Sequence, residues 1–287
     1  MPDQSGRTFV ITGANSGIGL AAARQIAAAG AHVILAVRDL AKGGAAAAGL
    51  SGDPEVRALD LADLASVRGF AEGLDRDIDV LINNAGVMAT PHRTTADGFE
   101  LQFGTNHLGH FALTGLLRPR IRTRVVTISS GGHRIGRINF DDLQSERSYH
   151  RWLAYGRSKL ANLLFMYELQ RRFEAAGSPV RSVAAHPGYA ATNLQFHTES
   201  IQDRMMALGN RIFAQSDERG AWPTVYAATT PDLAGGSYVG PDGFLEQRGN
   251  PKLVGSSAAA RDEETARRLW EVSEELTGVR YEFGTAA

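Results

Sequence analysis

The sequence of 287 residues contains no cysteine. This absence excludes disulfide bonds, thiolate catalysis and any zinc site built on sulfur, and it fits a reducing compartment. Long hydrophobic runs are also missing, so we expect no membrane span. The first strand-like segment begins near Arg7, which leaves no room for a signal peptide. We therefore expect a cytoplasmic protein.

The chain also lacks an excess of charge of either sign. With 30 basic and 31 acidic residues, the formal net charge is -1, so no bulk field would attract nucleic acid or an anionic membrane. Lysine is scarce, because the basic residues are arginine except at Lys42, Lys159 and Lys252. A lysine kept at position 159 is therefore a candidate functional residue.

A short apolar strand at residues 9–11 runs into a glycine-rich turn and then into an alanine-rich helical segment. This order is typical of a site that binds a pyrophosphate, because glycine lets the backbone approach the ligand and the helix N-terminus supplies free N–H groups. The residues of the turn that we assign to a cofactor are Gly13, Asn15, Ser16, Gly17, Ile18 and Gly19.

The second strand, residues 32–37, ends at Arg38 and Asp39. At this point of a dinucleotide fold an acid binds the ribose 2′-hydroxyl of NAD, whereas an arginine accommodates the 2′-phosphate of NADP. Arg38 favours NADP(H), by roughly tenfold to hundredfold if its charge-assisted hydrogen bond contributes about 1.5–3 kcal/mol. If Arg38 is instead a solvated strand end, Asp39 would bind the ribose and NAD(H) would be preferred.

Two further strand ends carry polar or small residues. Asp60 and Leu61 follow the strand at residues 56–59, and Asp60 could accept a hydrogen bond from an adenine amine or cap the next helix. The strand at residues 80–82 leads into small residues and amides that suit close packing against a flat ligand. From these turns we assign Asp60, Leu61, Asn83, Ala85 and Gly86 to the cofactor.

Tyr155 and Lys159 are four residues apart at the start of a segment, residues 153–175, that we predict to be a long helix. On a helix they would lie one above the other on the same face. A neighbouring cation favours the phenolate and would lower the pKa of a tyrosine from about 10 toward a range that is useful for acid–base catalysis. The spacing alone also arises by chance.

The alternation of apolar strands and helical segments predicts a single Rossmann-type, doubly wound α/β domain at residues 1–287, with a mostly parallel seven-stranded sheet flanked by helices on both faces. Residues 99–117, 218–230 and 261–277 should each be helical. His107 and His110 are three residues apart in the first of these, but no third ligand is nearby, so we predict no metal site.

Taken together, these residues make the chain resemble the short-chain dehydrogenase/reductase family over essentially its whole length. Within that family, the motif at residues 106–111, the long segment between Ser130 and Tyr155 and the motif at residues 269–273 resemble the retinol dehydrogenase branch. The landmarks that occur in the order of the family are residues 12–19, residues 83–86, Ser130, Tyr155 with Lys159, and Pro187-Gly188 with Thr192.

The resemblance implies roles for these residues. Tyr155 would protonate a carbonyl oxygen during reduction or take the hydroxyl proton during oxidation. Lys159 would lower the pKa of Tyr155 and bind the nicotinamide ribose. Ser130 would hydrogen-bond the substrate oxygen, and Asn106 would hold a water that links Lys159 to solvent. Tyr155, Lys159, Pro187, Gly188 and Thr192 would complete the cofactor site, and residues 131–154 and 189–217 would form the substrate pocket.

We therefore expect an NADP(H)-dependent oxidoreductase that interconverts a carbonyl and an alcohol on an apolar small molecule. The alternatives are an NAD-preferring alcohol dehydrogenase and a nucleotide-sensing regulator without turnover, although such regulators usually lose the tyrosine or the lysine. Relatives often pair as symmetric dimers or tetramers, so a homodimer or homotetramer is an expectation of the family. Vertebrate members often begin with an apolar anchor, which we do not find here, so retinoid metabolism does not follow.

Overall fold

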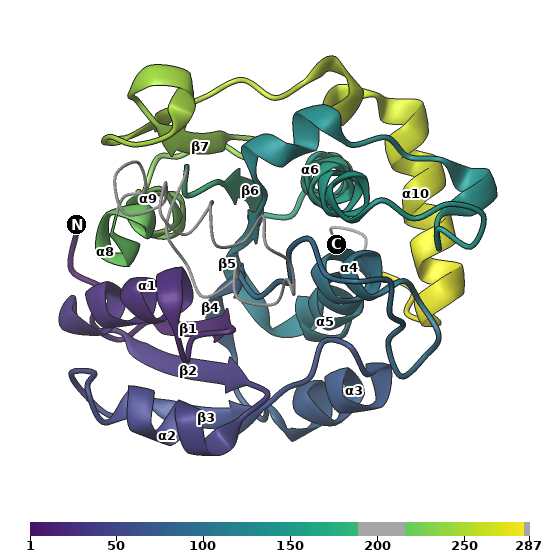
Figure 1. The fold of residues 1–287 in the computed structure, drawn as a ribbon. Helices are drawn as coiled ribbons and strands as arrows, with labels where there is room; N and C mark the ends of the chain where they lie inside the picture. The colour runs from purple at the N-terminus through teal and green to yellow at the C-terminus, as the bar shows by residue number, and fades with distance from the viewer. Residues whose placement is uncertain (189–215, 284–287) are drawn as a thin grey trace, which may run out of the picture.

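An eight-stranded sheet lies between two layers of helices in the computed structural model, which describes residues 1–188 and 216–283 (Figure 1). The strand order is β3-β2-β1-β4-β5-β6-β7-β8, and each strand is parallel to its neighbours except β8, which is antiparallel to β7. The strands are β1 (Thr8–Thr12), β2 (His32–Val37), β3 (Glu55–Ala58), β4 (Ile78–Asn83), β5 (Ile121–Ile128), β6 (Arg181–Ala185), β7 (Tyr238–Pro241) and β8 (Pro251–Leu253).

Both faces of the sheet are covered, which explains why the central strands are almost continuously apolar. Successive side chains of a strand point to opposite faces. Thus Phe9 and Ile11 of β1 pack in a core with α1 (Gly17–Ala28) and α9 (Trp222–Thr229), whereas Val10 packs in a core with α3 (Leu64–Gly73), α5 (Gly109–Leu117) and α6 (Arg151–Ala175). The strand order reverses between β1 and β4, and this reversal opens a crevice at their carboxyl ends.

The predicted fold class is confirmed, but the predicted number of strands is wrong. The additional strand is β8, which has three residues and includes the exposed Lys252 and Leu253. A strand of three residues, the last two of them exposed, is too short to show alternation in the sequence.

Two of the predicted helices are interrupted. Residues 99–117 form α4 (Leu101–Phe103), a π-helical turn (Gly104–Leu108) and α5. Residues 217–229 form α8 (Asp217–Gly220) and α9, which has Pro223 in its first turn, where the missing N–H of proline is tolerated. The remaining α-helices, α2 (Leu40–Ala47) and α10 (Glu263–Thr277), are uninterrupted. Across the described residues, no helix has the length and apolar character needed to span a membrane.

Candidate active site

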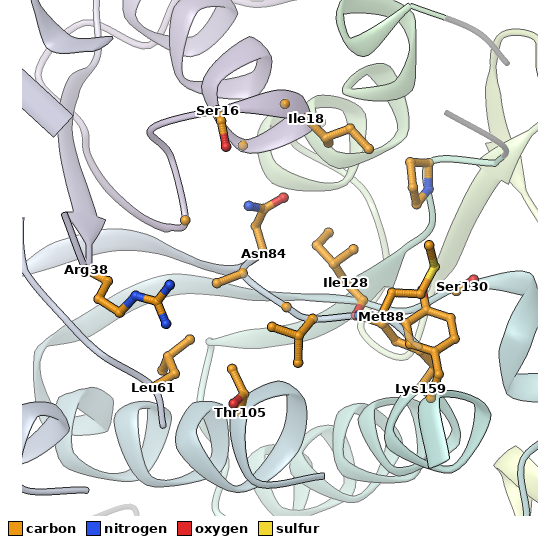
Figure 2. A pocket seen from close by; sticks show the side chains of 18 of the residues that line it. Ser16, Ile18, Arg38, Leu61, Asn84, Met88, Thr105, Ile128, Ser130 and Lys159 are labelled. Carbon is orange, nitrogen blue, oxygen red and sulfur yellow. The ribbon is translucent and has the colours of Figure 1, made fainter. Parts of the chain in front are cut away.

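A cavity of about 830 Å³ opens at the carboxyl ends of the parallel strands, where the strand order reverses (Figure 2). Its lining comes from the turns after strands β1 to β6, from the π-helical turn and from the first turns of α6. The predicted residues that line it are Gly13, Asn15, Ser16, Gly17, Ile18, Gly19, Arg38, Asp60, Leu61, Ala85, Gly86, Ser130, Tyr155, Lys159, Pro187 and Gly188. Thr192 and nearly all of the predicted pocket segment 189–217 lie outside the described residues.

The turn after β1 fits an anionic group. Gly13 has a φ of +67°, and a Cβ on it would lie 2.9 Å from the Cβ of Ala85, so this position needs glycine. Gly19 is packed still more tightly, because its Cβ would lie 2.5 Å from the carbonyl oxygen of Gly13. In the described chain no side chain caps the N-terminus of α1, and its first turn contains no acidic residue. The free N–H groups can therefore receive a pyrophosphate.

Asn84 lines the cavity in place of the predicted cofactor residue Asn83. Asn83 is buried at the end of β4, where its Nδ2 donates to Thr114 Oγ1 at 2.9 Å, and it does not line the cavity. Asn84 lines the cavity instead, and its Nδ2 donates to the carbonyl oxygen of Thr12 at 2.8 Å. Side chains alternate along a strand, so the register of β4 decides which of the two asparagines faces the ligand.

The end of β2 presents cations to the cavity. Arg38 is exposed and points into the pocket (Figure 2). Asp39, the rival ribose ligand, caps α2 by accepting from Lys42 N at 3.0 Å and also pairs with Lys42 Nζ at 3.3 Å. The backbone hydrogen bond from Lys42 is the main cause of a lowered Asp39 pKa. Lys42 also lines the cavity, although the sequence had not pointed to it.

Tyr155 and Lys159 lie on α6 and line the cavity. Lys159 lies at the opposite end of the cavity from Arg38 (Figure 2). Burial raises the pKa of Tyr155, and its hydrogen bond with Ser130 acts against this rise. Burial also lowers the pKa of Lys159 to about 8. The ammonium lies 5.7 Å from the centre of the Tyr155 ring, and its Nζ donates to the carbonyl oxygen of Ile128 at 3.2 Å. Burial is thus the main influence on the Tyr155 pKa in this structure, and the lowering of that pKa by Lys159 stays a prediction.

Ser130 lies two residues after the end of β5 and caps the N-terminus of a 3₁₀ helix, Gly131–Ile135. Its Oγ accepts a hydrogen bond from Gly132 N at 3.1 Å. A Cβ on Gly132 would lie 3.1 Å from Cε1 of Tyr155 and 3.5 Å from Oγ of Ser130. The serine turn and the tyrosine ring are thus packed together, and a side chain at position 132 would push them apart.

Asn106 lies in the π-helical turn and is completely buried. Its Oδ1 accepts from Val87 N and its Nδ2 donates to Val87 O, each at 2.8 Å. The same Nδ2 donates to Ser158 Oγ at 2.9 Å. A Cβ on Gly86 would lie 3.0 Å from Asn106 Oδ1 and 3.6 Å from Lys159 Nζ. Asn106 therefore holds the segment that begins at Val87 in place. Asn106 itself lies close to Lys159.

The family model described as short chain dehydrogenase matches residues 7–202, more than half of the chain. The chain belongs to the short-chain dehydrogenase family. Its resemblance to the retinol dehydrogenase branch is confirmed by relatives that are more than 40% identical over almost the whole chain.

Retinol dehydrogenase 14 of Mus musculus is 42% identical over 300 residues, which cover 96% of this chain and 86% of that protein. Retinol dehydrogenase 12 of Homo sapiens is 42% identical over 294 residues and covers 96% and 88%. Polyprenol dehydrogenase of Mus musculus is 40% identical over 297 residues and covers 97% and 86%. These relatives identify the chain as a carbonyl/alcohol oxidoreductase that depends on a nicotinamide cofactor.

Among solved structures, an uncharacterized protein from Mycobacterium paratuberculosis is 52% identical, with a TM-score of 0.86 over 98% of this chain and 97% of that one. A Beutenbergia cavernae protein described as an NAD(P) dependent gluconate 5-dehydrogenase, with bound NADP, is 29% identical. Its TM-score is 0.62, over 79% of this chain and 90% of that one. The Rossmann fold of this short-chain dehydrogenase thus has close solved counterparts.

Several lining residues of this short-chain dehydrogenase were not predicted individually. Trp152 could have been found, because it lies three residues before Tyr155 on the same face of α6 and its ring meets the tyrosine edge-on at 6.5 Å. Ile135 carries no signal of its own, although it lies in the predicted pocket segment. The other additional lining residues include Val87, Met88, Ala89 and Thr105.

The two histidines near Asn106 have structural partners. His110 lies 2.9 Å from Thr12 Oγ1 through Nε2 and 3.0 Å from the Asn106 carbonyl oxygen through Nδ1. His107 Nε2 lies 2.9 Å from Ser273 Oγ. Among residues 1–188 and 216–283, no three His, Cys, Asp or Glu side chains are grouped so that they could hold a metal ion.

Proposed function

We propose that this enzyme reduces an apolar aldehyde or ketone with NADPH, using Tyr155 as the general acid. The observation that supports the proposal is that Ser130, Tyr155 and Lys159 line the same cavity. Ser130 and Lys159 lie at the opposite end of this cavity from Arg38 (Figure 2). Met88, Ile135 and Trp152 add apolar surface near the tyrosine. An apolar substrate is therefore the class that we propose for this pocket.

The protein groups would act on the substrate oxygen. When bound, the nicotinamide supplies or accepts the hydride. Ser130 Oγ would donate a hydrogen bond to the substrate oxygen, and Tyr155 would deliver its proton to that oxygen during reduction. Burial raises the pKa of Tyr155, so the phenol remains protonated at neutral pH. The protonated phenol is the form that can donate its proton to a carbonyl oxygen.

Lys159 would bind the nicotinamide ribose, because its ammonium lies beside Tyr155 in the same cavity. The proton path from Lys159 to solvent through a water near Asn106 stays a prediction. Its support is that Asn106 Oδ1 and Lys159 Nζ both lie close to Gly86. We expect the residues of the turn after β1, together with Pro187, Gly188 and Thr192, to complete the cofactor site.

Preference for NADP(H) is supported by the two cations, Arg38 and Lys42, at the end of β2. The NAD-preferring alternative would need Asp39 as the ribose ligand, but its carboxylate already caps α2. The sensing alternative is disfavoured because both Tyr155 and Lys159 are present and lie in the cavity. We propose a cytoplasmic enzyme that works as a homodimer or homotetramer without a nucleic acid partner.

The proposal is tested by following NADPH consumption with a panel of aldehydes and ketones, from short aliphatic to long and polycyclic. We expect turnover by the wild type and a loss of about 10²- to 10⁴-fold in Tyr155→Phe, which keeps the ring but removes the proton. Tyr226→Phe is the matched control, because Tyr226 lies on α9 outside the cavity lining. Tight binding of NADPH without turnover, including alcohols with NADP in reverse, would instead favour the sensing function.

A further inference from the structure

His133 bridges the candidate catalytic serine to a distant part of the chain. Its ring is buried in the 3₁₀ helix that follows Ser130. The backbone N–H of Ser257 donates to His133 Nε2 at 3.1 Å, and His133 Nδ1 lies 2.7 Å from the carbonyl oxygen of Ser130. Because Nε2 accepts, the proton of the neutral ring is on Nδ1, which therefore donates to Ser130. Both contacts define a single tautomer.

The histidine ring is also held by packing. The ring of Tyr238 on β7 meets it edge-on, at a centroid distance of 5.9 Å and an angle of 83°. Burial lowers the pKa of His133, which keeps the ring neutral. A neutral ring is what the two hydrogen bonds require, since an imidazolium would have no lone pair for Ser257 N–H.

The orientation of the Ser130 turn depends on this ring. The Ser130 carbonyl oxygen accepts twice from residue 133, from the backbone N at 3.0 Å and from Nδ1 at 2.7 Å. The same turn contains Gly132, whose backbone N donates to Ser130 Oγ and which packs against Tyr155. A shift of the His133 ring would therefore move Ser130 Oγ relative to the phenol.

We propose that His133 is a positioning residue, which aligns Ser130 with Tyr155 through the Ser130 carbonyl. The inference rests on the proposed function, in which Ser130 binds the substrate oxygen. His133 lies outside the residues that line the cavity, so it acts through Ser130 and not by touching substrate. The hydrogen bond from Ser257 N–H holds the His133 ring in place, and the hydrogen bond from the ring to the Ser130 carbonyl oxygen fixes the position of Ser130.

Two variants separate these bonds. In His133→Asn the amide nitrogen takes the place of Nδ1 and keeps the bond to Ser130, whereas in His133→Gln the amide oxygen takes the place of Nε2 and keeps the bond to Ser257. We expect kcat for carbonyl reduction to stay within about threefold of wild type in His133→Asn. It should fall roughly 10- to 100-fold in His133→Gln, because small displacements of catalytic groups are costly. The Kd for NADPH and the thermal midpoints should be similar in the two variants.

A double variant tests whether the effect passes through Ser130. If it does, Ser130→Ala with His133→Gln should be no slower than Ser130→Ala alone, because coupled residues are not additive. Equal losses in the two single variants, a fully active His133→Gln, additive losses in the double variant or a His133→Gln protein that does not fold would each overturn the inference. An undiminished kcat in Ser130→Ala would contradict the proposed function itself, and is thus a distinct result.

Discussion

The ammonium of Lys159 is buried, and burial disfavours its charged form. Desolvation lowers its pKa from 10.5 to about 8, which corresponds to about 3 kcal/mol of unfavourable free energy for the charged form. Its Nζ donates to the Ile128 carbonyl oxygen, but that oxygen also accepts from Asn162 Nδ2 at 3.0 Å. Removing the ammonium therefore leaves no unsatisfied acceptor.

We expect Lys159→Met to raise the free energy of unfolding at pH 7 by roughly 1–3 kcal/mol while it abolishes turnover. Below pH 8 the folded and unfolded states both hold the proton, so the full cost is present in the wild type. Between pH 8 and 10.5 the unfolded state holds more protons, so wild-type stability rises and the advantage of the variant shrinks. Urea unfolding at pH 7 and pH 10.5 measures this difference. Lys252→Met, at an exposed position, is the control, and a less stable Lys159→Met at pH 7 would contradict the argument.

Arg38 should determine cofactor preference. In Arg38→Ala we expect the affinity for NADPH to fall about 10- to 100-fold, because a charge-assisted hydrogen bond to phosphate is lost, while the affinity for NADH changes little. Fluorescence titration of both cofactors at one ionic strength measures the ratio. Arg122→Ala controls for the loss of one positive charge, because Arg122 lies at the amino-terminal end of β5 and does not line the cavity. Equal losses for the two cofactors would show that Arg38 does not read the 2′-phosphate.

At the scale of elements, side chains of the interrupted helix hold one wall of the cavity. Gln102 on α4 is completely buried, and its Oε1 accepts from Ala89 N at 2.8 Å. Its Nε2 donates to the Arg151 carbonyl oxygen at 2.9 Å and to Tyr149 OH at 2.8 Å. Gln102 thus links the wall that contains Ala89 to the first residue of α6, one turn before Tyr155.

Gln102→Met keeps the side-chain length but removes these bonds. We expect a loss of roughly 1–3 kcal/mol in the free energy of unfolding, because buried partners lose their hydrogen bonds. The KM for the carbonyl substrate should rise, since Ala89 and the adjacent wall are no longer tied to α6. Steady-state kinetics and urea unfolding measure both effects. Gln25→Met, which loses only exposed hydrogen bonds, should change neither, and an unaltered KM in Gln102→Met would rule out the link.

At the scale of the whole molecule, three of the buried histidines have pKa values low enough to make acid destabilising. Burial lowers the pKa of His107 to about 3 and those of His110 and His186 to about 4. The unfolded chain, with pKa values near 6.5, therefore binds more protons between about pH 4 and pH 6.5. Stability should fall as the pH drops through this window, with these residues contributing at most about 4 kcal/mol per pH unit.

Urea unfolding between pH 7 and pH 5 tests this dependence. His107→Gln retains an amide that can donate to Ser273 Oγ, the partner of His107 Nε2, but it cannot titrate. We expect the slope of the free energy of unfolding against pH to decrease by the contribution of about one titrating proton. His150→Gln, at an exposed position, should leave the slope unchanged. A slope that is the same in His107→Gln and wild type would contradict the assignment.

Local order along the chain was enough to predict much of the site. The strand, glycine turn and helix around Gly13, and the spacing of Tyr155 and Lys159, depend on short-range geometry that the sequence displays directly. The choice between Asn83 and Asn84 was missed because it depends on the register of β4 in the sheet. Gln102 was missed because its partners lie up to 49 residues away.

By itself, the sequence determined the fold class, the family and the position of the glycine-rich turn after β1, because strand and helix periods and glycine spacing are local properties. The tertiary structure alone decided which groups of the site are buried. Tyr155 was expected to have a pKa lowered by its neighbour on the helix, whereas burial raises that pKa and the hydrogen bond with Ser130 acts against the rise. Burial arises from contacts between distant segments, which no local spacing in the sequence displays.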